Sequence, residues 1–235
     1  MRQGFRVARR RSPLRLLALG VVWAALALFA LFIVLVGLYT FVRPVSTLML
    51  ARTIEGKSYQ RIYAPLKTIA PIALASVVAS EDASFCDNDG VDWGSLREVL
   101  SGAGKHGPSR GASTITMQTA KNLFLWPGRS TIRKGIEIGM ALVMGEAWSK
   151  PRTLEIYLNI AEWGDGIYGI EAAAQHYFHK SARELNPHEA ALLATALPNP
   201  ILRNPARPTS LQRRLAGSLE AKARENSDLL KCLPR

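Results

Sequence analysis

Residues 71–82 read PIALASVVASED, an apolar run that opens with proline and closes with two adjacent carboxylates. Proline is favoured in the first turn of a helix, and apolar residues follow at helical spacing, so the run predicts a helix over 71–80. A carboxylate at the end of an apolar helix can be partly desolvated, which raises its pKa and suits it to proton transfer near neutral pH. Glu81 and Asp82 are therefore candidate acid–base residues, and an ordinary solvated helix end is the alternative.

The sequence around this helix is also helical in pattern. Strand-like alternation is scarce, no internal repeat occurs, and glycine gathers with proline in residues 101–111, which predicts a loop. Further helices are expected over 96–100, 113–124, 132–148, 151–161, 170–177, 187–197 and 208–224, with a glycine-rich turn at 163–169 and a loose end after 224. Together they predict one mostly α-helical domain of about 180 residues, which is large enough for a sizeable core.

An uncharged apolar segment of 27 residues, 16–42, lies between Arg15 and Arg43. About 20 apolar residues are enough to cross the hydrocarbon core of a bilayer. Six arginines precede the segment, so the N-terminus is expected to be cytoplasmic and the remainder periplasmic or extracellular. A cleaved signal peptide is the alternative, but its apolar region is typically about 7–15 residues long. We therefore expect an uncleaved, single-pass anchor.

The positive charge is concentrated near the N-terminus. The chain has 30 Lys and Arg against 18 Asp and Glu, a net charge of +12, and the first 54 residues hold eight arginines and no acid. The remainder is only weakly basic, which disfavours a nucleic-acid-binding function. Two cysteines, Cys86 and Cys232, are too few for a disulfide framework or a four-thiolate zinc site. Whether they pair, or Cys86 stays a buried thiol, is left open by their spacing.

Two further stretches carry polar chemistry. Ser113 and Thr114 stand at the start of an expected helix, where an anion is favoured, although a plain helix cap is the alternative. Arg133 and Glu137 lie four residues apart on one helix face, which suits a phosphate clamp or an ordinary salt bridge. No Ser-x-x-Lys sequence occurs, which excludes a penicillin-type acyl-transferase module on this chain. The four histidines form no recognisable set of metal ligands.

Five segments, in this order, resemble the motifs of the peptidoglycan glycosyltransferases of glycosyltransferase family 51. They read EDASFCDNDGVD (81–92), GASTITMQTAKN (111–122), RKGIE (133–137), SKPRTLEIYLN (149–159) and GIYGIEAAAQHYF (166–178). Asn88 stands where the family usually has histidine, and Met117 where it usually has glutamine. The resemblance covers about residues 65–205, and a single anchor with one catalytic domain resembles the monofunctional branch of the family.

The resemblance implies a lysozyme-like, mostly α glycosyltransferase domain over 65–205. We expect a basic cytoplasmic tail at 1–15, a transmembrane helix at 16–42, a juxtamembrane connector at 43–64 and a polar C-terminal tail at 206–235. A membrane-touching subdomain is implied around 94–130. Its apolar surface would come from residues that could equally be core, namely Leu123, Phe124, Leu125 and Trp126.

The resemblance also implies the reaction and its residues. Lipid II is polymerised into β-1,4-linked glycan with release of undecaprenyl pyrophosphate, on the periplasmic side of the bacterial inner membrane. Glu81 is the expected general base on the acceptor hydroxyl, and Glu137 is a second catalytic carboxylate that positions cations. The expected substrate-binding residues are Asp82, Phe85, Ser113, Thr114, Gln118, Lys121, Asn122, Arg133, Lys134 and Lys150.

The implied ligands and partners follow from the same resemblance. A hard cation such as Mg²⁺ would fit between a carboxylate and pyrophosphate, although the sequence does not require one. The expected partners are lipid II, the growing glycan, the bilayer and other cell-wall synthesis or division proteins, with no nucleic acid. Two rival functions stay open: a lytic enzyme that uses a glutamate as general acid, and a catalytically impaired anchored scaffold, suggested by Asn88 and Met117.

Overall fold

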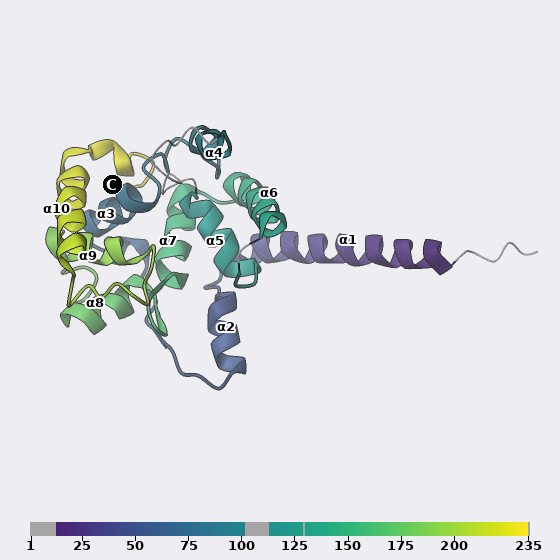
Figure 1. The fold of residues 1–235 in the computed structure, drawn as a ribbon, viewed down its shortest axis with the longest axis horizontal. Helices are drawn as coiled ribbons and strands as arrows, with labels where there is room; N and C mark the ends of the chain where they lie inside the picture. The colour runs from purple at the N-terminus through teal and green to yellow at the C-terminus, as the bar shows by residue number, and fades with distance from the viewer. Residues whose placement is uncertain (1–12, 102–112, 129, 235) are drawn as a thin grey trace, which may run out of the picture. The chain divides into compact units, whose positions relative to one another are not determined.

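The computed structural model describes residues 13–101, 113–128 and 130–234, and it consists of two units that divide after residue 41. In the first unit, helix α1 (Pro13–Tyr39) is long and apolar enough to cross a membrane (Figure 1). Its bounds agree with the expected transmembrane helix to within three residues at each end. The arginines at 2–11, residues 102–111 of the loop expected at 101–111, and Ala112 of the second motif lie outside the described residues.

The second unit is built mostly of helices, as expected. They are α2 (Thr47–Ile54), α3 (Pro71–Glu81), α4 (Trp93–Leu100), α5 (Ile115–Phe124), α6 (Thr131–Ala147), α7 (Lys150–Ile160), α8 (Ile170–Phe178), α9 (Pro187–Ala196) and α10 (Ser210–Glu225). Two short 3₁₀ helices, η1 (Leu66–Thr68) and η2 (Ser227–Leu230), complete the helical elements of the described residues. The sequence did not predict α2, η1 or η2.

Helix α3 is the centre of the main core. Residues 73–79 are all buried, so the helix is covered on every side rather than along one stripe. Helices α9 and α10 pack against it (Figure 1). Alanines such as Ala73, Ala190 and Ala194 are buried in this cluster, and their small side chains let the helices approach closely. A helix that is buried all round is held rigidly, and its last residue is Glu81.

Three helices that carry site residues each begin with a hydroxyl cap. Thr114 accepts a hydrogen bond from the Met117 amide, Ser130 from the Arg133 amide and Ser149 from the Arg152 amide. A side-chain oxygen at this position satisfies a backbone N–H that the helix cannot pair. The caps therefore fix where α5, α6 and α7 start. Helix α5 packs against both α6 and α7 (Figure 1).

A small sheet joins the segment before α3 to the segment after α7. Strands β1 (Gln60–Arg61), β2 (Glu162–Gly164) and β3 (Ile167–Tyr168) lie in the order β1–β3–β2, with β1 parallel and β2 antiparallel to β3. Gln60 pairs with Ile167 in this register. The turn expected at 163–169 is the β2–β3 hairpin, and Gly166 adopts a φ of +70° within it.

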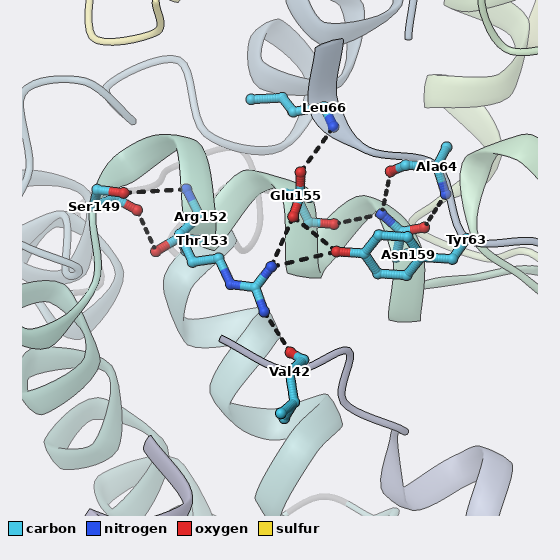
Figure 2. Close-up of polar contacts among 9 residues, drawn as sticks. All are labelled: Val42, Tyr63, Ala64, Leu66, Ser149, Arg152, Thr153, Glu155 and Asn159. Carbon is cyan, nitrogen blue, oxygen red and sulfur yellow. Dashed lines mark hydrogen bonds and ion pairs between the residues drawn. The ribbon is translucent and has the colours of Figure 1, made fainter. Parts of the chain in front are cut away.

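Buried polar contacts tie residues 63–66 to helix α7 (Figure 2). The Asn159 side chain accepts a hydrogen bond from the Ala64 amide and donates one to the Ala64 carbonyl, both at 2.8 Å. Glu155 accepts from the Tyr63 hydroxyl at 2.7 Å and from the Leu66 amide at 2.9 Å. Arg152 donates to Glu155 and also to the Val42 carbonyl. The expected connector thus contains α2 and β1 and is bonded to the helical core at its end.

The C-terminal segment is ordered beyond α10, contrary to the expected loose end. Residues 227–230 form η2, and Leu229 is buried. Cys232 forms a disulfide with Cys86, with 5.3 Å between their Cα atoms, which answers the open question of pairing. The disulfide explains why this segment is ordered and not loose. It joins residues 146 positions apart, and the local sequence carries no signal for such a contact.

Candidate active site

Glu81 lies at the last residue of α3, where that helix meets the start of α5. Its Oε2 accepts a hydrogen bond from Gln118 Nε2 at 2.9 Å, and its Oε1 accepts one from Ser80 Oγ at 3.1 Å. Burial raises the pKa of Glu81, and the hydrogen bond from Gln118 opposes this rise. The prediction of a partly desolvated carboxylate at the end of an apolar helix is confirmed.

Gln118 is held in one orientation by a buried tyrosine. The Tyr157 hydroxyl donates to Gln118 Oε1 at 3.1 Å, which leaves the amide nitrogen to face Glu81. The same nitrogen also lies 3.4 Å from the Ser113 carbonyl. Tyr157 is fully buried and was not among the expected site residues, although it lies within the fourth motif. Sequence alone gives its position but not its partner.

Asp82 points into the protein rather than into a cleft. It is buried, and Oδ2 accepts a hydrogen bond at 3.0 Å from the amide of Ile115, the first residue of α5. Asn88 Nδ2 donates to both carboxylate oxygens, at 3.0 and 3.2 Å, and Ser84 Oγ donates to Oδ1 at 3.1 Å. Burial raises the pKa of Asp82, and these donors oppose the rise. Asp82 therefore joins the end of α3 to the start of α5.

Lys150, the first residue of α7, is bonded to the loop that contains Asn88. Its Nζ donates to the Asn88 carbonyl at 2.6 Å and to Asn88 Oδ1 at 3.1 Å. The ammonium also lies 4.8 Å from the centre of the Phe85 ring, a cation–π contact. Burial lowers the pKa of Lys150, and the charge of Asp82 opposes this. The side-chain amide of Asn88 and the ammonium of Lys150 thus hold the first motif together.

A second group of charges lies on α6. Glu137 is 2% exposed and pairs with Lys134 Nζ at 2.7 Å and with Arg133 Nη1 at 3.7 Å. Ser113 Oγ accepts from Lys134 at 2.9 Å and lies 3.3 Å from Glu137 Oε1. The salt-bridge interpretation of Arg133 and Glu137 is confirmed, and the pair is buried beside Ser113, while the phosphate clamp stays a prediction. One buried carboxylate is therefore shared by two cations.

Lys121 lies between Glu81 and this α6 group. Burial lowers its pKa, and the charge of Glu137 opposes this while Arg133 and Lys134 add to it. Among the described residues, no acceptor or carboxylate lies within hydrogen-bond or ion-pair distance of the Lys121 ammonium. It is therefore available to an anion. Asn122 follows on α5, and its backbone carbonyl accepts from Thr47 at 3.1 Å. Gln118, Lys121 and Asn122 share one face of α5 by helical spacing.

A cleft of about 710 Å³ opens beside Glu81. Its lining includes Ser113, Gln118, Arg203 and Lys222. Arg203 is fixed by a 2.5 Å hydrogen bond to the Thr195 carbonyl. Arg203 and Lys222 were not expected as site residues, because neither lies in a motif and only the fold brings them to Glu81. The cleft therefore brings two cations, Arg203 and Lys222, near its carboxylate.

Two expected substrate-binding side chains are buried in the protein. Phe85 is fully buried beneath Lys150, and Thr114 is 1% exposed, with its hydroxyl donating to the Gly90 carbonyl at 2.6 Å and capping α5. The prediction that Phe85 and Thr114 contact a substrate directly is wrong, because neither side chain is exposed. Of the adjacent pair of hydroxyls, Thr114 is the cap and Ser113 faces the charges of α6.

Met117 is part of the apolar core. Its side chain is fully buried in a cluster with Val91 and Ala141. A thioether is well suited to such a position, because it fills irregular space without needing a hydrogen-bond partner. The departure at residue 117 therefore changes packing behind α5, while Gln118 carries the amide that faces Glu81.

Glu137, the carboxylate expected beside Mg²⁺, is already paired with protein cations. Among the described residues no group of three or more His, Cys, Asp or Glu side chains could hold a metal. Glu137 already pairs with Lys134 and Arg133, so a cation bound there would have to displace an ammonium at 2.7 Å.

Comparison with known proteins gives a consistent family. The transglycosylase family model matches residues 47–223. A biosynthetic peptidoglycan transglycosylase of Brucella suis biovar 1 is 52% identical over 208 residues, which cover 88% of this chain and 93% of the relative. Proteins of the same name from Agrobacterium fabrum and Mesorhizobium japonicum are 50% and 48% identical over 221 and 230 residues. These matches cover 93% and 97% of this chain and 98% of each relative.

Proposed function

This chain belongs to the transglycosylase family and is a peptidoglycan glycosyltransferase of cell-wall synthesis, and we propose that it polymerises lipid II with Glu81 as the general base. One observation carries the proposal. A partly desolvated carboxylate, Glu81, is connected through Gln118 and Ser113 to the cations on α6 that pair with the buried Glu137. Proton transfer and anion stabilisation, the two demands of this reaction, thus meet in one continuous site.

Glu81 takes the proton of the acceptor's 4-hydroxyl. The oxygen attacks the anomeric carbon of the reducing-end sugar of the growing chain, and the bond from that carbon to the pyrophosphate oxygen breaks. The new link is β-1,4 with inversion, and undecaprenyl pyrophosphate leaves with the bonding electrons. A pKa raised by burial makes the ionised carboxylate a stronger base.

The departing pyrophosphate needs charge stabilisation more than a proton. Lys121, Arg133 and Lys134 surround the position that we assign to it, and fixed cations in a partly dehydrated site act without reorganising during the reaction. Glu137 holds Arg133 and Lys134 in place, which makes it a positioning carboxylate. Lys150 has a different task from the expected one, because its ammonium is bonded to Asn88.

The anchor places the enzyme where its substrate is. Helix α1 anchors the chain in a membrane, and the lipid of lipid II stays in the bilayer. By the distribution of arginines we assign the N-terminus to the cytoplasm and the second unit to the periplasmic side of the bacterial inner membrane. We assign the growing glycan and other cell-wall synthesis or division proteins as its partners there.

The proposal is tested with detergent-solubilised, full-length protein and labelled lipid II. Wild type should form polymer and the Glu81→Gln variant should not, because an amide cannot accept the proton. Glu146→Gln is the matched control, since Glu146 is an exposed carboxylate on α6, and it should behave as wild type. Polymer from Glu81→Gln would refute the assignment of the base. Cleavage of finished glycan by wild type, without polymer from lipid II, would support the lytic rival instead.

A further inference from the structure

The loop that follows Glu81 is fastened to the C-terminus at two adjacent residues. Cys86 is disulfide-bonded to Cys232, and the Cys232 amide donates to Cys86 Sγ at 3.3 Å. Next to this bond, Asp87 Oδ1 pairs with Lys231 Nζ at 2.6 Å. We call residues 226–234 the C-terminal clamp. It lies beyond residue 223, where the match to the family model ends.

The clamp is itself held by the core. Leu229 is buried in the main cluster, and Leu230, Cys232 and Leu233 pack against that cluster. Asn226 caps η2 by accepting from the Asp228 amide. The clamp therefore presents a fixed attachment point to the loop rather than a free end.

The fastened loop carries the contacts that arrange the catalytic residues. Asn88 lies two residues after Cys86; it donates to both oxygens of Asp82 and accepts from Lys150. Asp82 is bonded to the catalytic Glu81 along the chain, and through the Ile115 amide it fixes the start of α5, which carries Gln118. A displacement of Asn88 is thus transmitted to the base and to the amide that orients it.

Of the two fastenings, the covalent one is the stronger. Lys231 is about half exposed and Asp87 is 63% exposed, and ion pairs between exposed groups contribute little. A disulfide between residues 146 positions apart restricts the loop at all salt concentrations. Loss of the ion pair alone should consequently leave the loop in place.

We propose that the Cys86–Cys232 disulfide is a positioning device of the active site, which holds Asn88 so that Glu81, Asp82 and Lys150 keep their working arrangement. The enzyme reaches full turnover only when the C-terminal clamp is closed, so its activity depends on an oxidising compartment. This inference rests on the proposed function and adds a positioning residue pair whose second member, Cys232, lies outside the match to the family model.

The test uses the folded, full-length enzyme, so that a variant's failure to fold does not decide it. Dithiothreitol reduces the bond: each cysteine sulfur gains a hydrogen, and the reagent closes to its cyclic disulfide. Dibromomethane then reacts with the two thiolates, forms a methylene bridge between the sulfurs and releases two bromide ions. Cys86 and Cys232 are the chain's only two cysteines, so the bridge forms at one place. The Cys86→Ser/Cys232→Ser protein, treated with both reagents, controls for their other effects.

We expect reduction to lower kcat on lipid II by about 10- to 100-fold, since misplacement of a catalytic group by about 1 Å has effects of that size. KM should change little, because the cations assigned to pyrophosphate lie on α5 and α6 and are not part of the loop. The methylene bridge should restore kcat and make it insensitive to reductant. Lys231→Gln, which removes only the ion pair, should keep the wild-type kcat.

Several results would overturn the inference. One is a reduced enzyme with unchanged kcat, and another is a methylene-bridged enzyme that stays as slow as the reduced one. A third is a fall in kcat that follows the loss of folded protein, measured by circular dichroism at the assay temperature, because the disulfide would then be only a structural staple. If oxidised wild type forms no polymer at all, the proposed function fails and this inference fails with it.

Discussion

Gly145 allows helix α6 to lie directly against the loop of residues 88–90, and Gly145→Ala should therefore impair catalysis. A Cβ at residue 145 would lie 2.0 Å from the carbonyl oxygen of Asp89 and 3.3 Å from the Cα of Gly90. Gly90 approaches α6 from the other side, with a φ of +110° that favours glycine. Two glycines thus face each other where the loop crosses the helix.

The size of the effect follows from that distance. Contacts closer than 3.0 Å do not persist, so the Asp89 carbonyl must retreat by about 1 Å or the helix must bend away. Asn88 precedes Asp89 and holds Asp82 and Lys150. Misplacement by about 1 Å can cost about 100-fold in rate, or about 2.7 kcal/mol of activation free energy. Overpacking should also lower stability by about 1–3 kcal/mol, partly offset by the better helix propensity of alanine.

Gly139→Ala is the matched control on the same helix, because a Cβ there would have nothing within 4 Å. It should leave kcat unchanged and raise stability by up to about 1 kcal/mol. Polymerisation of labelled lipid II gives kcat, and thermal denaturation gives the stability of each variant. If Gly145→Ala and Gly139→Ala have equal kcat, the reasoning that links the position of the 88–90 loop to catalysis is refuted.

Three other predictions concern the base, the core and the metal. Burial raises the pKa of Glu81, and the base works in its ionised form, so kcat/KM should fall as the pH drops through that raised pKa. Gln118→Leu removes a hydrogen bond that lowers this pKa and should move the acid limb of the pH profile to higher pH. An acid limb that does not move would contradict the assignment of the base. Asn159→Ala leaves the buried amide and carbonyl of Ala64 without their side-chain partner and should lower the free energy of unfolding by about 3 kcal/mol, visible in thermal denaturation, while a loss below about 1 kcal/mol would show that the backbone finds new partners. Since Lys134 and Arg133 already occupy Glu137, polymerisation should persist in EDTA, and a loss that added Mg²⁺ reverses would show that a metal takes part.

Helices with local signals could be predicted from the sequence, and helices without them could not. Pro71 opens α3 and Pro187 opens α9 next to the Asn186 cap, so their starts were within reach of sequence reasoning. Helix α2 has eight residues, and its first residue, Thr47, donates to the carbonyls of Asn122 and Leu125. Such a short helix depends on tertiary contacts that lie far away in the chain.

The site could be predicted as a group of segments but not as a set of roles. The ordered motifs bring Glu81, Gln118, Lys121 and Glu137 together as expected. Spacing cannot tell that Thr114 caps α5 while Ser113 faces Lys134, because both hydroxyls suit either task. The same limit applies to the apolar stretch near the end of α5, where Leu123 and Leu125 are core and Trp126 is 56% exposed.

The two departures from the family pattern argue against a scaffold that has lost its activity. Met117 occupies the apolar cluster behind α5 and leaves the amide of Gln118 to meet Glu81. The side chain of Asn88 is a hydrogen-bond donor and an acceptor at the same time. Its Nδ2 donates to Asp82, and its Oδ1 accepts from the Gly90 amide and from Lys150. An amide combines two donors and an acceptor oxygen with two lone pairs, whereas a neutral imidazole offers one donor and one acceptor. Asparagine therefore completes the loop that the disulfide holds, and it needs no proton of its own because Glu81 supplies the base.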